Sequence, residues 1–139
     1  MKSFLAILFI LAFSVTAFAI DHVVQDFMDV FEEMDELSLQ CDEATTPAQQ
    51  AAILNQFANL LGDLQTRSAA LEEKYPNMDE DNMPEGMGDL NELGERFMVA
   101  FFTIYAVGAE NTEETQVAAA YEKIDAQLTA IMGEDSWEE

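Results

Sequence analysis

The chain contains one histidine, His22, and its position near the start of the sequence is typical of one kind of metal site. If the first nineteen residues are removed, the new chain begins Ile20-Asp21-His22. A free α-amine, two deprotonated backbone amides and the imidazole of a third-position histidine offer four nitrogens in one plane, which suits Cu(II) or Ni(II). We therefore predict a metal site at Ile20, Asp21 and His22. The alternative is an ordinary exposed histidine.

The remaining residues do not form a catalytic pattern. One histidine at one end of the chain provides no general base beside a mid-chain nucleophile, as Ser-His-Asp and Cys-His catalysis require. The sequence Gly86-Met87-Gly88 begins like a dinucleotide fingerprint, but Asn91 occupies the third glycine position and a loop precedes the motif. No Glu-x-x-His pair is present for a di-iron bundle site. The sequence predicts that the protein is not an enzyme, and it identifies no cofactor.

The loop from Asn77 to Gly88 contains carboxylates and thioethers, both of which bind metals. A calcium loop that starts at Asn77 needs glycine at its sixth position and glutamate at its twelfth, where this chain has Asn82 and Gly88. Thioethers suit Cu(I). A solvated loop is the interpretation that we prefer over metal binding. The methionines of this region are Met78, Met83 and Met87.

Acidity is the strongest feature of the composition, with 28 acidic residues, five basic residues and a net charge of −23. Nucleic acid is excluded as a partner and anionic membranes are disfavoured, because both are bound through basic residues. We predict a non-catalytic binding protein, resembling an inhibitor or immunity protein, that engages a basic protein or cations; a surface that is only solvated by its charge is the alternative. Residues 20–46 contain nine acids and no lysine or arginine. The predicted partner face consists of Asp26, Asp29, Glu32, Glu33, Asp35 and Glu36.

The first nineteen residues have the pattern of a cleavable signal peptide. Lys2 precedes an apolar run of about ten residues, which is too short to span a bilayer, and Ala17-Phe18-Ala19 is a small-x-small cleavage site. We therefore expect a secreted or periplasmic protein with no membrane span. Its mature part, residues 20–139, is expected to be a single helical domain with a frayed acidic tail over residues 134–139.

Four segments have the spacing of amphipathic helices. The second begins at Thr46-Pro47 with Gln49 as a capping-box partner, and ends near Lys74, before a tyrosine and a proline. We expect the third helix over residues 85–109 and the fourth from about residue 112 to Gly133, which stops it. The apolar stripe of the first helix, which places the single cysteine in the core, is Val23, Phe27, Val30, Met34, Leu37 and Cys41.

Four helices joined by short loops, without strand patterns, predict an all-α fold, an antiparallel up-down-up-down four-helix bundle. The first and fourth helices are neighbours in that topology, so residues 20–46 and 112–139 are expected to form one strongly negative side. The helix count, the helix lengths and the longer middle loop resemble small periplasmic bundles of the cytochrome b562 kind. That resemblance implies haem ligation by a methionine early in helix one, where Met28 lies, and a histidine late in helix four. Helix four has no histidine here, so haem binding is not predicted.

The segment from Phe97 to Ala109 is apolar on all sides except at Thr103. We expect it to form the most buried helix of the bundle. The alternative is a surface for a homo-oligomer or another partner that includes Met98, Phe102 and Tyr105. A third function stays open as well, because the core of a helical bundle can open into a cavity for a small hydrophobic ligand.

Overall fold

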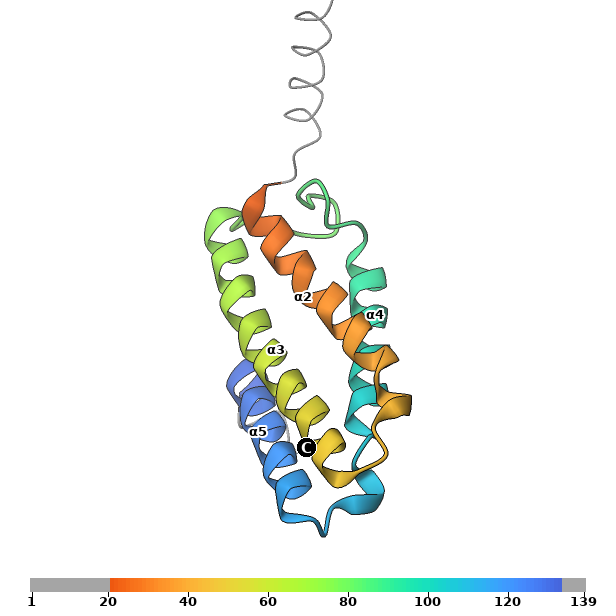
Figure 1. Cartoon of the computed structure of the whole chain (residues 1–139). Helices are drawn as coiled ribbons and strands as arrows, with labels where there is room; N and C mark the ends of the chain where they lie inside the picture. Colours follow the sequence, from red (N-terminus) through yellow and green to blue (C-terminus); the bar gives the residue numbers. More distant parts are fainter. Residues whose placement is uncertain (1–20, 134–139) are drawn as a thin grey trace, which may run out of the picture.

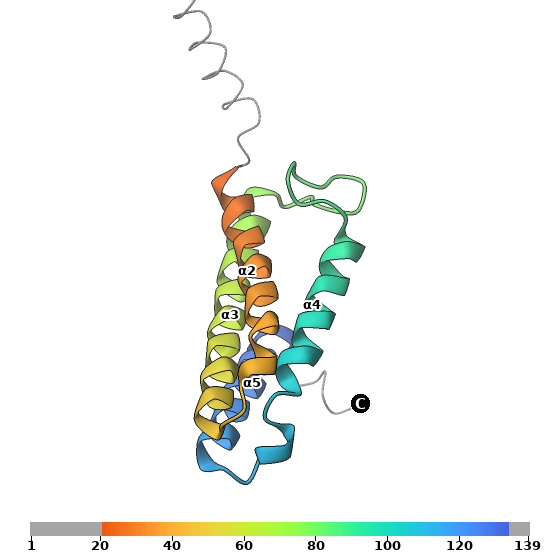
Figure 2. The ribbon, with the colours of Figure 1, turned by 45° about the vertical axis from the view of Figure 1, so that its right-hand side comes forward.

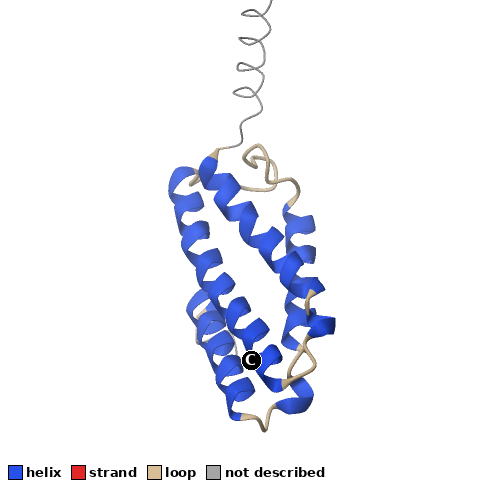
Figure 3. Cartoon of the chain, viewed as in Figure 1, coloured by secondary structure: helices blue, strands red, loops and turns tan. Residues whose placement is uncertain are grey.

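The computed structural model describes residues 21–133, and within them the chain forms four α-helices and no strand (Figures 1 and 3). The predicted all-α four-helix bundle is confirmed. The predicted signal peptide, Ile20 and the acidic tail over residues 134–139 lie outside the described residues. The helices are α2 (His22–Leu39), α3 (Pro47–Lys74), α4 (Leu90–Tyr105) and α5 (Thr115–Met132), with short 3₁₀ turns at η1 (Cys41–Glu43) and η2 (Ala109–Asn111).

The ends of α3 lie where the sequence predicts them. Thr46 Oγ1 accepts a hydrogen bond from the backbone N–H of Gln49 at 3.2 Å, and Gln49 Oε1 accepts one from the backbone N–H of Thr46 at 3.2 Å. This reciprocal capping box satisfies N–H groups that a helix start otherwise leaves unpaired. The helix then runs for 28 residues to Lys74, one residue before Tyr75-Pro76.

The helix α4 is shorter than the predicted span of residues 85–109. Gly86 and Gly88 have φ angles of 96° and 70°, a left-handed conformation that only glycine adopts readily. The chain therefore enters the helix later, at the N-cap Asp89, whose Oδ1 accepts a hydrogen bond from the backbone N–H of Asn91 at 2.8 Å. At the other end the helix passes into turns after Tyr105.

The helices are not arranged as predicted, with each helix beside the next one along the chain and the first beside the fourth. The helix α2 packs against α3 on one side and α4 on the other, and α5 packs against α3 (Figures 1 and 2). The expectation that the first and fourth helices are neighbours is wrong, because α2 and α5 make at most marginal contact. The loop after α3 therefore leads across the end of the bundle to the far side of α2. The acidic residues of α2 and α5 consequently do not merge into one face.

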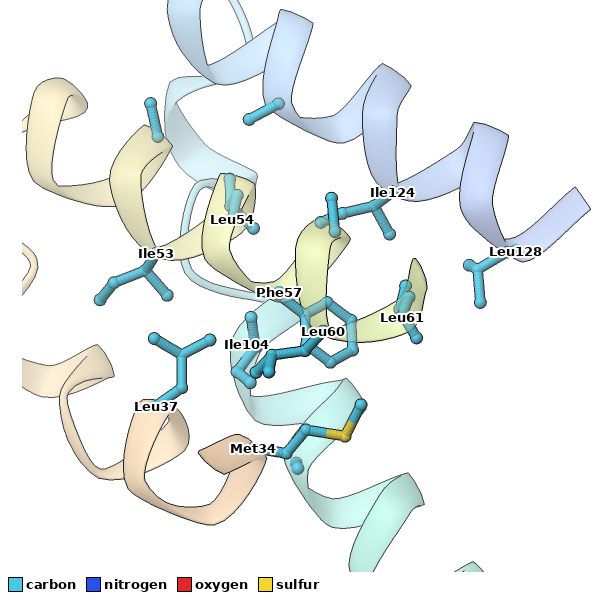
Figure 4. Packing of buried hydrophobic residues seen from close by; sticks show 14 of the residues in the cluster. Met34, Leu37, Ile53, Leu54, Phe57, Leu60, Leu61, Ile104, Ile124 and Leu128 are labelled. Carbon is cyan, nitrogen blue, oxygen red and sulfur yellow. The ribbon is translucent and has the colours of Figure 1, made fainter. Parts of the chain in front are cut away.

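The largest hydrophobic cluster surrounds the first half of α3. Phe57 is fully buried at its centre, with Met34 of α2 and Ile104 of α4 on one side and Ile124 of α5 on the other (Figure 4). Cys41 packs against the edge of this cluster and is half-buried. It is therefore less buried than the predicted core position. Its Sγ–H donates to the backbone oxygen of Leu37 at 3.5 Å.

A second, smaller cluster lies at the opposite end of the bundle, where the long loop packs against α2, α3 and α4. Met87 of this loop is buried, and Met78 and Met83 pack against the same cluster. These methionines therefore have an apolar packing role, which the sequence interpretation of a solvated loop missed. The buried members of the cluster are Val24, Phe31, Leu71, Met87 and Leu93.

Among the described helices, none combines the length and the apolar character that are needed to cross a membrane.

Candidate functional site

The bundle is open on one side because α5 ends before α3 does. The side chain of Gln127 lies 3.5 Å from where a Cβ on Gly62 would be, and Gln65 Nε2 donates to the backbone oxygen of Ala130 at 3.3 Å. These pairs show that the two helices run side by side in the same direction. Beyond the second pair, α5 continues for two residues and α3 for nine. At about 1.5 Å per residue, α3 therefore extends past α5 by about 10 Å.

A groove of about 670 Å³ lies at this open position. All four helices contribute to its walls, and most of the lining side chains are aliphatic or aromatic. Phe27 and Phe31 come from α2, Leu93 and Phe97 from α4, and Leu128 from α5. Ligand sites in proteins typically have volumes of about 300–1,000 Å³ and predominantly apolar linings, so both the size and the chemistry fit a small hydrophobic molecule.

Several apolar residues around this groove remain accessible to solvent. Leu90 is 37% exposed, Ile131 is 39% exposed and Met132 is 56% exposed. All three line the groove. Scattered exposed hydrophobic residues are common, but a contiguous group around a concave surface is typical of a binding site.

Gly94 of α4 leaves room in the wall of the groove. A Cβ added there would have no heavy atom of a neighbouring side chain or segment within 4 Å. A Cβ in that position therefore meets no clash, and a larger side chain that extends from it into the groove would reduce the space that is open to a ligand. The glycine also lies inside a helix, where it is less favourable than alanine by about 1 kcal/mol.

The polar residues of the groove lie along one edge of α3. Gln65, Ser68 and Glu72 follow one another at spacings of three and four residues, which places them on one helix face. Ser68 lies between Leu64 and Leu71 at spacings of four and three residues, so it interrupts an apolar stripe of this helix, and it lines the groove. Within residues 21–133, Glu72 is the only ionisable residue of the lining, and no lysine or arginine from this range contributes to it. The groove therefore has apolar walls and one polar edge with a carboxylate.

The predicted partner face on α2 is flanked by basic side chains from both neighbouring helices. Arg67 of α3 donates to the backbone oxygen of Asp26 at 2.6 Å, and Arg96 of α4 donates to Asp35 Oδ2 at 2.6 Å. Lys74 donates to Asp21 at the start of the helix. Three of the four basic residues in the described part of the chain thus hold α2 in place.

The structure divides the predicted partner face into two groups. The carboxylate of Asp35 is bound to Arg96, and Asp29 Oδ1 accepts from Gln25 Nε2 at 2.7 Å. The other members of the face are exposed, and two of them line a polar groove of about 320 Å³ between α2 and α3 together with Asp63. The four exposed members are Asp26, Glu32, Glu33 and Glu36.

Of the predicted N-terminal metal site, Asp21 and His22 are described. Asp21 is the N-cap of α2, and its Oδ1 accepts from the backbone N–H of Val23 at 2.9 Å. The hydrogen bonds from Lys74, Val23 and Tyr75 lower the pKa of Asp21 to about 2. His22 is an exposed residue of the first helical turn. Within residues 21–133, no three His, Cys, Asp or Glu side chains are grouped to hold a metal ion. The site at Ile20, Asp21 and His22 stays a prediction.

The expected burial of the apolar segment 97–109 is wrong. Only Ala100 and Ile104 of its helical part are buried in the core, because α4 packs mainly against one helix, α2. Met98 and Phe102 are exposed, and Tyr105 is half-buried with its ring 5.0 Å from that of Tyr121. A homo-oligomer surface that includes Met98, Phe102 and Tyr105 stays a prediction.

No protein-family model, curated protein or solved structure matches this chain.

Proposed function

We propose that this protein is a non-catalytic binding protein that holds a small hydrophobic molecule in the groove between the second half of α3 and the facing parts of the other helices. The observation that supports this most directly is the difference in reach between α3 and α5, which leaves apolar side chains of all four helices around one concave surface. Of the functions predicted from the sequence, the hydrophobic-ligand carrier fits this geometry best.

The energetics are consistent with useful affinity. Each methylene group that moves from water into an apolar site contributes about 0.8 kcal/mol. The bundle outside the groove is closed by the large cluster around Phe57, so ligand binding does not require the core to open. A largely formed site lowers the cost of ordering on binding.

The proposal is tested by filling the groove with a side chain from its own wall. We expect Gly94→Phe to weaken binding of the neutral dye N-phenyl-1-naphthylamine about tenfold or more. The thermal midpoint should stay the same or rise, because a helical glycine is removed. Dye fluorescence titration and circular dichroism measure the two effects.

Gly62→Ala is the matched control, because it also removes a helical glycine but lies beside Gln127 and not in the groove lining. It should leave dye affinity unchanged. If Gly94→Phe is folded and binds the dye as tightly as the unmodified protein does, the groove is not the binding site.

A second candidate function is binding of a basic protein by the exposed acids of α2. The specific observation in its favour is that Arg67, Lys74 and Arg96 bond to other groups of α2. Among the described residues, the exposed carboxylates of Glu32, Glu33 and Glu36 therefore form no ion pair. A surface of one sign accelerates encounter with a partner of the opposite sign. Export from the cell, which would bring such a protein into contact with secreted partners, is part of this proposal.

This second candidate is tested with two variants of equal charge change and lysozyme as a basic probe. One variant replaces Asp26, Glu32, Glu33 and Glu36 by their amides, and the other replaces Glu73, Asp79, Glu80 and Asp81 in the same way. We expect the first to weaken low-salt binding about tenfold more than the second. Equal losses would mean that only net charge matters and that α2 is not a partner face.

A further inference from the structure

The charged groups around the groove favour ligands of one sign. Glu72 is the only ionisable residue among the described residues that line it, and none of these is a lysine or arginine. Three of the four basic residues in the part of the chain that the structure describes are bound to α2. The fourth, Lys123, lies on α5 five residues before the nearest lining residue, Leu128.

We propose that the groove binds a cationic amphiphile, with its alkyl chain between α3, α4 and α5 and its ammonium group at the Glu72 carboxylate. This inference rests on the proposed binding of a hydrophobic molecule in the same groove and adds the chemical class of that molecule.

The arrangement of the lining matches such a molecule. The apolar walls are provided by α2, α4 and α5, whereas the polar edge follows α3 from Gln65 through Ser68 to Glu72. The amide of Gln65 is already bonded to α5 through the backbone oxygen of Ala130. This bond leaves Ser68 and Glu72 as the polar groups beside the last turns of α3, where a headgroup meets water.

An anionic amphiphile does not fit the same site. Its headgroup would lie beside Glu72, with no basic residue in the described part of the lining, in a chain with a net charge of −23. Like charges in contact are unfavourable, and the field of the whole protein adds to that effect at low ionic strength. A neutral headgroup escapes the repulsion but gains nothing from the carboxylate.

Three single-chain amphiphiles with the same dodecyl tail separate these cases. Dodecyltrimethylammonium, dodecyl maltoside and dodecanoate are titrated below their micelle concentrations against bound N-phenyl-1-naphthylamine. We expect the cation to displace the dye at the lowest concentration and the anion at the highest. Added salt should narrow the spread between them.

Two neighbouring glutamates provide a matched pair of variants. Glu72→Gln should weaken binding of the cation by about two- to fivefold, the range of an exposed ion pair, and leave the neutral amphiphile unchanged. Glu73→Gln removes the same charge one residue away, outside the groove lining, and should change neither affinity.

The outcomes distinguish this inference from the function on which it rests. If all three amphiphiles displace the dye equally, or if Glu73→Gln matches the effect of Glu72→Gln, the cationic ligand class is wrong while the groove remains the binding site. If none of them binds and Gly94→Phe has no effect on the dye, the proposed function itself is wrong.

Discussion

The two ends of the bundle differ in their packing and hydrogen bonding: at the end where η1 and η2 lie, Tyr121 and Gln50 make hydrogen bonds between segments and the helices are closely packed. At the other end, beside the loop of residues 75–89, the helices separate around the groove. We call these the turn end and the loop end. At the turn end Tyr121 Oη donates to the backbone oxygen of Tyr105 at 2.5 Å and accepts from the backbone N–H of Gly108 at 3.0 Å. Gln50, which is buried, accepts from Asn111 Nδ2 at 3.1 Å and donates to the backbone oxygen of Ala44 at 3.3 Å.

The loop end is held together differently. Its polar contacts include the pair of Lys74 with Asp21 and the bond from Arg67 to the α2 backbone, both at exposed positions. Its apolar groups include exposed side chains around the groove. The comparison shows that this small domain combines a closely packed, hydrogen-bonded end with an end at which a groove opens between the helices. The proposed ligand would bind at this second end.

The largest expected effect comes from disturbing the turn end at Gly108. An added Cβ would lie 2.6 Å from Val117 Cγ1 and 3.2 Å from Leu54 Cδ1. Because both neighbours are fully buried, they cannot move away freely, and overpacking of this kind costs about 1–3 kcal/mol. We expect Gly108→Ala to lower the free energy of unfolding by about that amount in urea denaturation. A variant as stable as the unmodified protein would mean that the turn end is not tightly packed.

The sequence predicted those parts of the fold that depend on local signals. Thr46, Pro47 and Gln49 define the start of α3, and Gly133, with a φ of 84°, ends α5 as predicted. The apolar stripe of α2 was predicted too narrow. Val24 and Phe31 are buried while Val23 and Phe27 are only half-buried, because α2 has neighbours on two sides.

The order of the helices and the groove could not be predicted in this way. Short loops are compatible with several arrangements, and no local pattern specifies that α5 packs on α3 and not on α2. The groove exists because α3 and α5 start at the same end of the bundle and differ in length. Which helices lie side by side is a property of the tertiary structure that local sequence patterns do not specify. Its only local sign was Ser68, which interrupts the apolar stripe of α3 and lines the groove.

The smallest expected effect concerns the loop end and its dependence on pH. The hydrogen bond from Lys74 is the main cause of the lowered pKa of Asp21, followed by the bond from the Val23 N–H. Because the folded pKa is about 2, below the ordinary value of 3.8, this contact stabilises the fold above about pH 4 and loses its contribution as the pH falls through about 2.

Lys74→Met should therefore raise the pKa of Asp21 and lower the free energy of unfolding at pH 7 by less than Gly108→Ala does. The two proteins should become equally stable as the pH approaches 2. Carboxyl ¹³C titration and urea unfolding at several pH values measure both effects. Lys123→Met removes the same charge from a lysine that has no ion-pair partner among the described residues, and it should leave Asp21 unchanged. An unaltered Asp21 pKa in Lys74→Met would assign the shift to the helix N-cap, and the loop end would then depend on ion pairing no more than the turn end does.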